Sequence, residues 1–122
     1  MPYIQHNANP CYISAPDCVI RAVSAATGKT WHQVYAELCV QGYKMCNLPH
    51  VNYVWAAYLT EQGYPMRRIA RACTVREFAE RHSDGIYILG TGTHAVAVIG
   101  GNYIDSWDSG DETPLYYFTL EE

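Results

Sequence analysis

Apolar residues recur at helical spacing in the first half of the chain. Between residues 18 and 27 they stand three or four positions apart, which predicts a helix with one buried face. These positions are Val19, Ala22, Val23 and Ala26. Asp17 precedes the segment as a favoured N-cap residue, and Gly28 follows it as a favoured helix end. The residues ahead of it, 1–16, contain three prolines and predict an extended lead-in.

Two more segments of this half predict helices. Thr30 and Gln33 match a capping box, so a second helix is expected from Trp31, with Gly42 as its end. A third helix is expected from about residue 50 to residue 62, because its apolar residues again share one face and a glycine follows it.

The pattern changes after Gly63 to short apolar segments separated by glycines and polar turns. Strands are expected at 64–70, 86–89, 94–99, 103–107 and 115–120, with a short helix at 74–82. Gly100-Gly101-Asn102 favours a hairpin between two of these strands. The sequence therefore predicts an α+β fold in which N-terminal helices pack on a C-terminal antiparallel sheet, with residues 1–122 as one domain.

Composition and charge argue against several classes of protein. Hydrophobic residues make up 49% of the chain and charged residues 16%, which is typical of a folded globule rather than a disordered segment. The net charge of −4 disfavours nucleic acid as a partner, because phosphate binding needs a cationic face. Apolar runs are far shorter than a membrane span, so no membrane partner is expected. Oligomeric state is left open.

The cysteines indicate a reducing compartment. Their number is five, and the first residues lack the basic and apolar regions of a signal peptide. We therefore expect free thiols, a cytoplasmic location and no cofactor or metal. A zinc site built on Cys39, Cys46 and His50 is the alternative, but no Cys-x-x-Cys pair supports it, and packed core thiols are favoured.

Cys18 and His94 are the residues most suited to chemistry. Cys18 stands in the first turn of a predicted helix, where free N–H groups and the positive helix end favour a thiolate. His94 opens an apolar strand directly after a glycine-containing loop, which favours a position facing a cleft. A thiol and an imidazole together can perform nucleophilic catalysis.

The third member of such a site depends on the length of the hairpin loop. A three-residue loop pairs Ile99 with Tyr103 and puts Asp108 opposite His94, so Asp108 is the first choice to orient the imidazole. A two-residue loop shifts the register and places Asp105 on the face of His94 instead. Asp105 is therefore the reserve.

The order and context of these residues resemble the papain-like cysteine peptidase superfamily. The segments that carry this resemblance are the helix that begins Asp17-Cys18-Val19-Ile20-Arg21-Ala22, the strand from His94 to Val98, and Asn102-Tyr103-Ile104 leading to Asp108. The small size is similar to that of its compact branch of bacteriocin-processing peptidases. Over nearly the whole chain, the sequence also resembles small phage and bacterial proteins that carry this helix and a Tyr-Ile-Asp-Ser-Trp-Asp-Ser-like hairpin.

The resemblance implies a papain-like fold with Cys18 as nucleophile, His94 as general base and Asp108 as the orienting acid. The implied function is a thiol hydrolase that cleaves a peptide, isopeptide or related acyl bond in a peptide or protein substrate. The alternative is a papain-fold binding module without catalysis, such as a phage protein that blocks a host factor. Equal reactivity of all five thiols would favour the binding module.

One position departs from the pattern of that superfamily. Tyr12 stands six residues before Cys18, where the superfamily places a glutamine whose amide helps to hold the oxyanion. Gln5, Asn7, Asn9 and Ser14 of the lead-in are the alternatives, with Asn9 preferred, and the backbone N–H of Cys18 is a further donor. Two neighbours of the trio carry open roles: Arg21 is either a surface ion-pair partner or a cation at the cleft, and Trp107 either shields the Asp–His pair or packs in the core.

Overall fold

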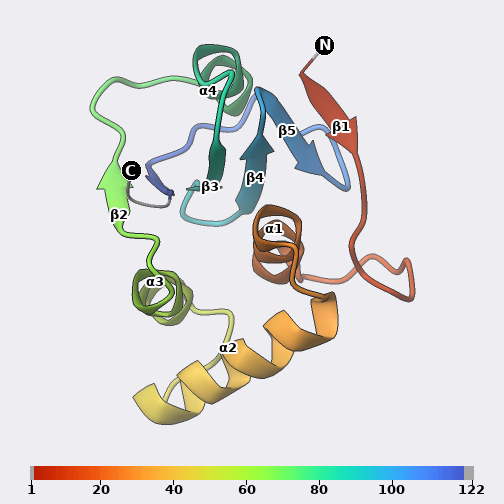
Figure 1. Cartoon of the computed structure of the whole chain (residues 1–122), viewed down its shortest axis with the longest axis vertical. Coiled ribbons are helices and arrows are strands. Elements are labelled where there is room, and N and C mark those ends of the chain that lie inside the picture. The colour runs from red at the N-terminus through yellow and green to blue at the C-terminus, as the bar shows by residue number, and fades with distance from the viewer. Residues whose placement is uncertain (1, 120–122) are drawn as a thin grey trace.

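A computed structural model describes residues 2–119 of the chain as four helices and a six-stranded sheet (Figure 1). The helices are α1 (Cys18–Thr27), α2 (Trp31–Met45), α3 (Asn52–Glu61) and α4 (Val75–Arg81). The strands are β1 (Tyr3–Gln5), β2 (Met66–Arg68), β3 (Ile86–Gly90), β4 (Ala95–Ile99), β5 (Asn102–Asp105) and β6 (Tyr116–Phe118). The α+β class is therefore confirmed. Leu120, the end of the last predicted strand, lies outside the described residues.

The sheet is mixed rather than antiparallel throughout, in the order β1-β5-β4-β3-β6-β2. Four neighbouring pairs are antiparallel, but β1 pairs in parallel with β5. The sequence predicted only an extended lead-in at β1. A three-residue strand that joins an edge through backbone hydrogen bonds carries too short a pattern to reveal its partner.

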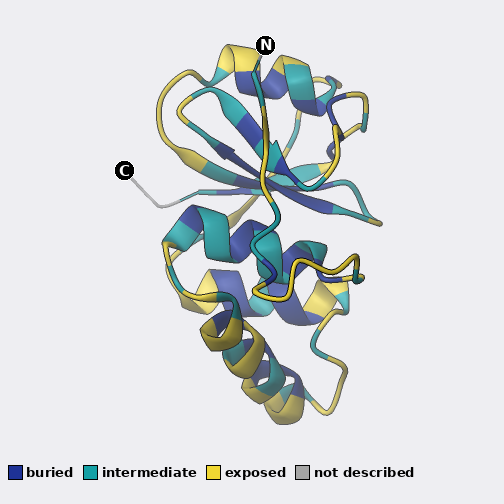
Figure 2. Ribbon diagram, turned by 90° about the vertical axis from the view of Figure 1, so that its right-hand side faces the viewer, coloured by how far each residue is buried: buried dark blue, intermediate teal, exposed yellow. Residues whose placement is uncertain are grey.

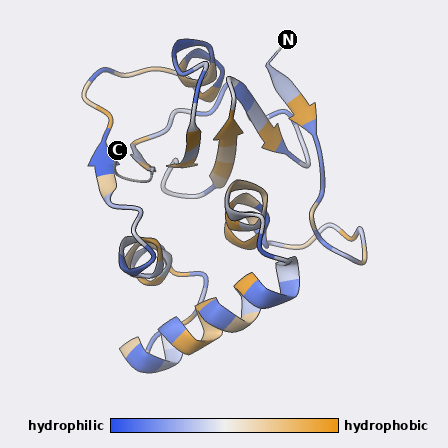
Figure 3. Cartoon of the chain, viewed as in Figure 1, coloured by the Kyte–Doolittle hydropathy of each residue, from blue (hydrophilic) through white to orange (hydrophobic). Residues whose placement is uncertain are grey.

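Two layers of helices enclose the sheet. The helices α1, α2 and α3 lie on one side of it and α4 on the other (Figure 1). Core residues of α1, α2 and α3, such as Val23, Leu38 and Trp55, pack with Ala97 of the sheet. A second core joins Phe78 of α4 to the opposite face. Figure 2 shows that burial concentrates where these layers meet, and Figure 3 shows that the central strands are the most hydrophobic.

α2 begins where the sequence predicts, but it ends three residues later than predicted. Thr30 accepts a hydrogen bond from the N–H of Gln33, as its capping position predicts. The helix does not stop at Gly42 but continues to Met45, because Gly42 serves a packing role. A Cβ added to Gly42 would lie 2.7 Å from the carbonyl oxygen of Asn47, so only glycine lets the chain return this closely.

The hairpin between β4 and β5 has the shorter of the two predicted loops. Ile99 pairs with Asn102, which leaves Gly100 and Gly101 as a two-residue turn. Both glycines have positive φ angles of 58° and 85°, the conformation that tight hairpin turns require. This register determines which carboxylate reaches His94.

Candidate active site

Cys18 lies at the point where the beginning of α1 meets the beginning of β4. α1 packs on β4, so the first residue of the helix faces the strand end that carries His94. The thiol is half-buried, and the His94 imidazole and the Ala95 backbone lie near enough to it to lower its pKa. The structure therefore brings together the predicted nucleophile and the predicted base.

The carboxylate beside His94 belongs to Asp105. His94 Nε2 lies 2.6 Å from Asp105 Oδ2, and the carboxylate is almost fully buried. An ionised carboxylate can only accept, so Nε2 carries the proton and Nδ1 is left to face the thiol of Cys18. Sulfur, imidazole and carboxylate thus lie in series, which is the arrangement of a catalytic triad.

Asp108, the first-choice third member, does not lie opposite His94, contrary to the prediction. It accepts hydrogen bonds from the Tyr103 hydroxyl and from the backbone N–H of Gly110, and an Arg76 nitrogen lies 3.7 Å from it. Its side chain is 43% exposed. The physical reason is the two-residue hairpin turn, which puts Asp105 on the face of His94 and carries Asp108 past the strand end.

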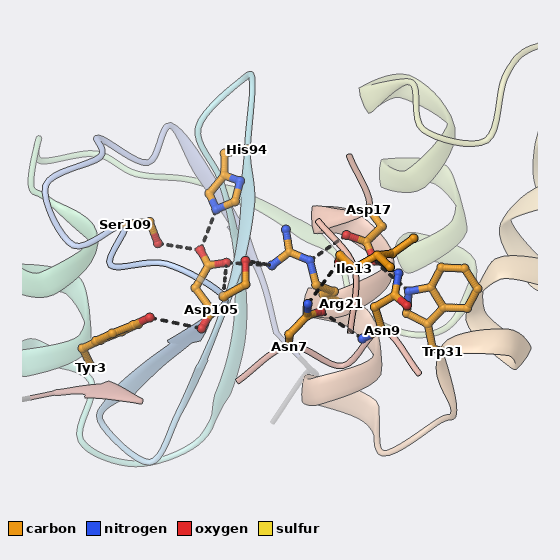
Figure 4. Close-up of polar contacts among 11 residues, drawn as sticks. Tyr3, Asn7, Asn9, Ile13, Asp17, Arg21, Trp31, His94, Asp105 and Ser109 are labelled. Atoms are coloured by element: carbon orange, nitrogen blue, oxygen red, sulfur yellow. Dashed lines mark hydrogen bonds and ion pairs between the residues drawn. The ribbon is translucent and has the colours of Figure 1, made fainter. Parts of the chain in front are cut away.

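Asp105 is held by donors on both carboxylate oxygens (Figure 4). Oδ2 accepts from His94 and, at 2.6 Å, from the hydroxyl of Ser109. Oδ1 accepts from the backbone N–H of Ser106 at 2.8 Å and from Arg21 Nη1 at 2.9 Å. Ser109 was not singled out in the sequence, because a lone serine in a loop carries no signal for such a contact.

Arg21 is not a surface ion-pair partner but a mostly buried cation that lines the cleft beside Cys18. Its side chain is 11% exposed and lies between two buried carboxylates, with Nε 2.7 Å from Asp17 Oδ1 and Nη1 on Asp105 (Figure 4). Asp17 occupies the N-cap position of α1 as predicted, but its side chain makes no N-cap hydrogen bond. Its carboxylate instead accepts from Arg21, from the Asn9 amide and from the Trp31 indole N–H.

These contacts favour a charged pair of thiolate and imidazolium. Burial raises the pKa of the Cys18 thiol, but hydrogen bonds and positive charge from His94, with Arg21 nearby, outweigh it and lower the pKa overall. Burial lowers the pKa of His94, but Asp105 and Cys18 outweigh it and raise the pKa to about 9. Burial raises the pKa of the Asp105 carboxyl, but hydrogen bonds from His94, Ser109 and Arg21 outweigh it and hold this pKa below its usual range.

A cleft of about 650 Å³ opens beside Cys18 and His94. Much of its wall is apolar and comes from Ile20, Leu38, Val51, Trp55 and Trp107. The Trp107 ring lies 5.0 Å from the His94 ring and is 46% exposed, so it covers the imidazole at the cleft rim rather than packing in the core.

Asn52 ties the loop ahead of His94 to α3. Its Nδ2 donates to the Gly92 carbonyl at 2.8 Å, and its Oδ1 accepts from the Trp55 indole N–H at 2.9 Å. Sequence reasoning did not identify this residue, since the contact spans 40 positions of the chain.

Asn9, the preferred oxyanion donor of the lead-in, has other partners. The Asn9 amide donates to Asp17, and its Oδ1 accepts from the N–H of Cys11. Tyr12 is 81% exposed at a positive φ of 55°. The backbone N–H of Cys18, at the open end of α1 that lines the cleft, is the donor best placed for this role.

The zinc alternative finds no support in the geometry. Within residues 2–119, no group of three or more His, Cys, Asp or Glu side chains is arranged to hold a metal ion. Cys39 and Cys46 are free thiols, and so are the other three cysteines. The helices of this described range are also too short or too polar to cross a membrane.

Comparison of the chain with protein-family models, curated proteins and solved structures finds no match. The papain-like relationship therefore stays a prediction, and the function is argued from the site alone.

Folding raises the pKa of His94 and lowers that of Cys18, so both groups should make the free energy of unfolding depend on pH. Between pH 6.5 and about 9, folded His94 keeps a proton that the unfolded chain has lost, so its contribution to stability falls as pH rises. The pKa of folded Cys18 lies below the usual 9.0 of the unfolded thiol, so the contribution of Cys18 to stability rises with pH between these two pKa values.

Cys18→Ser removes the rising contribution and leaves that of His94, whose pKa Asp105 still raises. We expect the free energy of unfolding of this variant to fall more steeply between pH 6.5 and 9 than that of the wild type. Urea titrations at several pH values measure the slope, with Cys39→Ser as the control that keeps the wild-type slope. Equal slopes in all three proteins would show that Cys18 and His94 do not share a proton.

Proposed function

We propose that this protein is a thiol hydrolase of papain-like architecture, which cleaves a peptide, isopeptide or related acyl bond through Cys18, His94 and Asp105. The observation that carries the proposal is the buried Asp105 carboxylate on His94 Nε2, with the thiol of Cys18 close to the same imidazole. A histidine that served only to fill space would not need a carboxylate, a thiol and an open cleft around it.

The reaction begins from the ion pair. The Cys18 thiolate attacks the acyl carbon, an S–C bond forms, and the carbonyl π electrons move to the oxygen. The N–H of Cys18 at the start of α1 donates to this oxyanion. The imidazolium of His94 then gives its Nδ1 proton to the leaving amine as the C–N bond breaks, which leaves a thioester and a neutral imidazole.

Hydrolysis of the thioester regenerates the site. His94 takes a proton from a water molecule, the hydroxide adds to the thioester carbon, and the thiolate of Cys18 leaves with the S–C bond electrons. Asp105 keeps Nε2 protonated and stabilises the imidazolium in both halves of the cycle. The apolar wall of the cleft favours an acyl group with an uncharged, apolar neighbour.

Trapping of an acyl-enzyme tests the proposal without knowledge of the substrate. On incubation with a chromogenic acetate ester, we expect a burst of one equivalent of the alcohol and an acetyl group on Cys18 in the mass spectrum, followed by slower release of acetate. Cys18→Ala removes the burst. His94→Ala slows acylation and leaves any thioester long-lived, because no base activates the water.

Cys39→Ser is the control, since this thiol lies outside the site and its loss should leave the burst intact. Acetylation spread evenly over the five cysteines, or none on Cys18, contradicts the proposal. Such a result would favour the binding module considered for the sequence.

A further inference from the structure

We propose that Arg21 is a positioning residue that acts through Asp105: it fixes the carboxylate so that Oδ2 faces His94, and it joins the helix of the nucleophile to the strand of the acid. This role rests on the proposed function, because it concerns the same site. Arg21 stands one turn after Cys18 on α1, and its Nη1 reaches Asp105 at the end of β5.

The two oxygens of Asp105 are divided between different sets of donors. Arg21 Nη1 and the N–H of Ser106 hold Oδ1, at 2.9 and 2.8 Å. His94 and Ser109 then hold Oδ2, both at 2.6 Å. Without Arg21, Oδ1 would keep only the Ser106 N–H as a donor, so the carboxylate would be held less firmly in the orientation that accepts the Nε2 proton of His94.

Arg21 is itself held in place from the other side. Its Nε donates to Asp17, whose second oxygen accepts from the Asn9 amide at 3.1 Å and from the Trp31 indole at 2.9 Å. The planar guanidinium binds two carboxylates through different nitrogens in a fixed geometry, which the single nitrogen of an ammonium does not provide. The chain therefore fixes Arg21 before any substrate binds, and Figure 4 shows it between the two carboxylates.

An ion pair that only stabilised the fold would not have to contact Asp105, the carboxylate that binds His94. Arg76 offers the comparison within the same chain: it also contacts two carboxylates, Asp108 and Asp111, but both are far more exposed than Asp105, and its contacts do not include His94 or Cys18. Arg76 stabilises a loop, whereas Arg21 contacts the acid that orients the imidazole.

A double-mutant cycle separates the positioning role from a structural one. The readout is the rate at which iodoacetamide alkylates Cys18 at pH 6, resolved by mass spectrometry of the intact folded protein. We expect Arg21→Met to slow this rate about tenfold, equivalent to a rise of about one unit in the apparent pKa of reactivity. In a background of Asp105→Asn, the same substitution should slow it much less, because the residue through which Arg21 acts is already disabled and only the direct effect of the Arg21 charge on the thiol remains. Arg76→Met should keep the wild-type rate.

Arg21→Lys keeps the charge and provides a second variant if Arg21→Met does not fold. We expect it to slow alkylation as well, since its ammonium cannot hold both carboxylates in the same geometry. A wild-type rate in this folded variant overturns the positioning role. So does an equal further loss in the Asp105→Asn background, which would mean that Arg21 acts on the thiolate directly or through the fold.

The alkylation rates distinguish a failure of the proposed function from a failure of the positioning role of Arg21. If wild-type Cys18 reacts no faster than the other cysteines, the function fails and the role of Arg21 with it. If Cys18 is preferred, depends on His94 and is unaffected by Arg21→Met, only the positioning role is overturned.

Discussion

Asp105→Asn is expected to lower the free energy of unfolding by about 3 kcal/mol, the scale of breaking a buried ion pair by removing one partner. The Asp105 carboxylate acts only as an acceptor in its hydrogen bonds with His94, Ser109, Ser106 and Arg21. An amide would turn one acceptor oxygen into a donor that faces other donors. It would also leave Arg21 without the charge of one of its two carboxylates, in a buried setting.

The same substitution should remove the low-pH reactivity of Cys18, because His94 would lose the charge that keeps it protonated. Asp108→Asn is the matched control. Asp108 is partly exposed and its contacts lie with Tyr103 and Gly110, so we expect little change in stability or in Cys18 alkylation. Urea unfolding followed by tryptophan fluorescence, together with the alkylation rate, measures both effects. A larger loss of reactivity in Asp108→Asn than in Asp105→Asn would restore Asp108 as the third member.

His94→Ala is expected to slow alkylation of Cys18 at pH 6 by about tenfold or more. Without the imidazolium, burial raises the pKa of the thiol and the thiolate becomes a small fraction at this pH. The loss is smaller than the fall in thiolate fraction, since a thiolate of higher pKa is intrinsically more nucleophilic.

His82→Ala is the control for this effect. His82 stacks on Phe78 with 3.8 Å between ring centroids and bonds the Phe78 carbonyl, on the face of the sheet away from α1. It should leave Cys18 reactivity unchanged. Equal rates in wild type and His94→Ala would show that the imidazole does not activate the thiol.

The local part of the fold could be predicted from the sequence. Helix periodicity placed α1 at Cys18–Thr27, and the capping box of Thr74 and Glu77 opens α4. These signals lie within one turn of helix, so short-range chemistry alone decides them. The prediction that α2 ends at Gly42 was wrong. Gly42 admits the returning chain near Asn47, and no local pattern reveals this contact.

The candidate site was predictable in its residue types but not in its register. Cys18 and His94 stood out because each begins an element, and the structure places them in contact. The choice between Asp105 and Asp108 rested on one residue of loop length, and one residue moves a side chain to the other face of a sheet. Arg21 contacts Asp105 from 84 positions away, a distance at which the sequence carries no pairing signal without the fold.

The pH dependence of labelling of the five cysteines tests the central claim most directly. Exposure alone would make Cys11 and Cys46 react first, since both are exposed while Cys18 is half-buried. The account predicts that Cys18 reacts first at pH 6, ahead of the two exposed thiols, and keeps a high rate below the usual thiol pKa of 9.0. A Cys18 rate that rises together with those of Cys11 and Cys46, or stays below them at every pH, would contradict it.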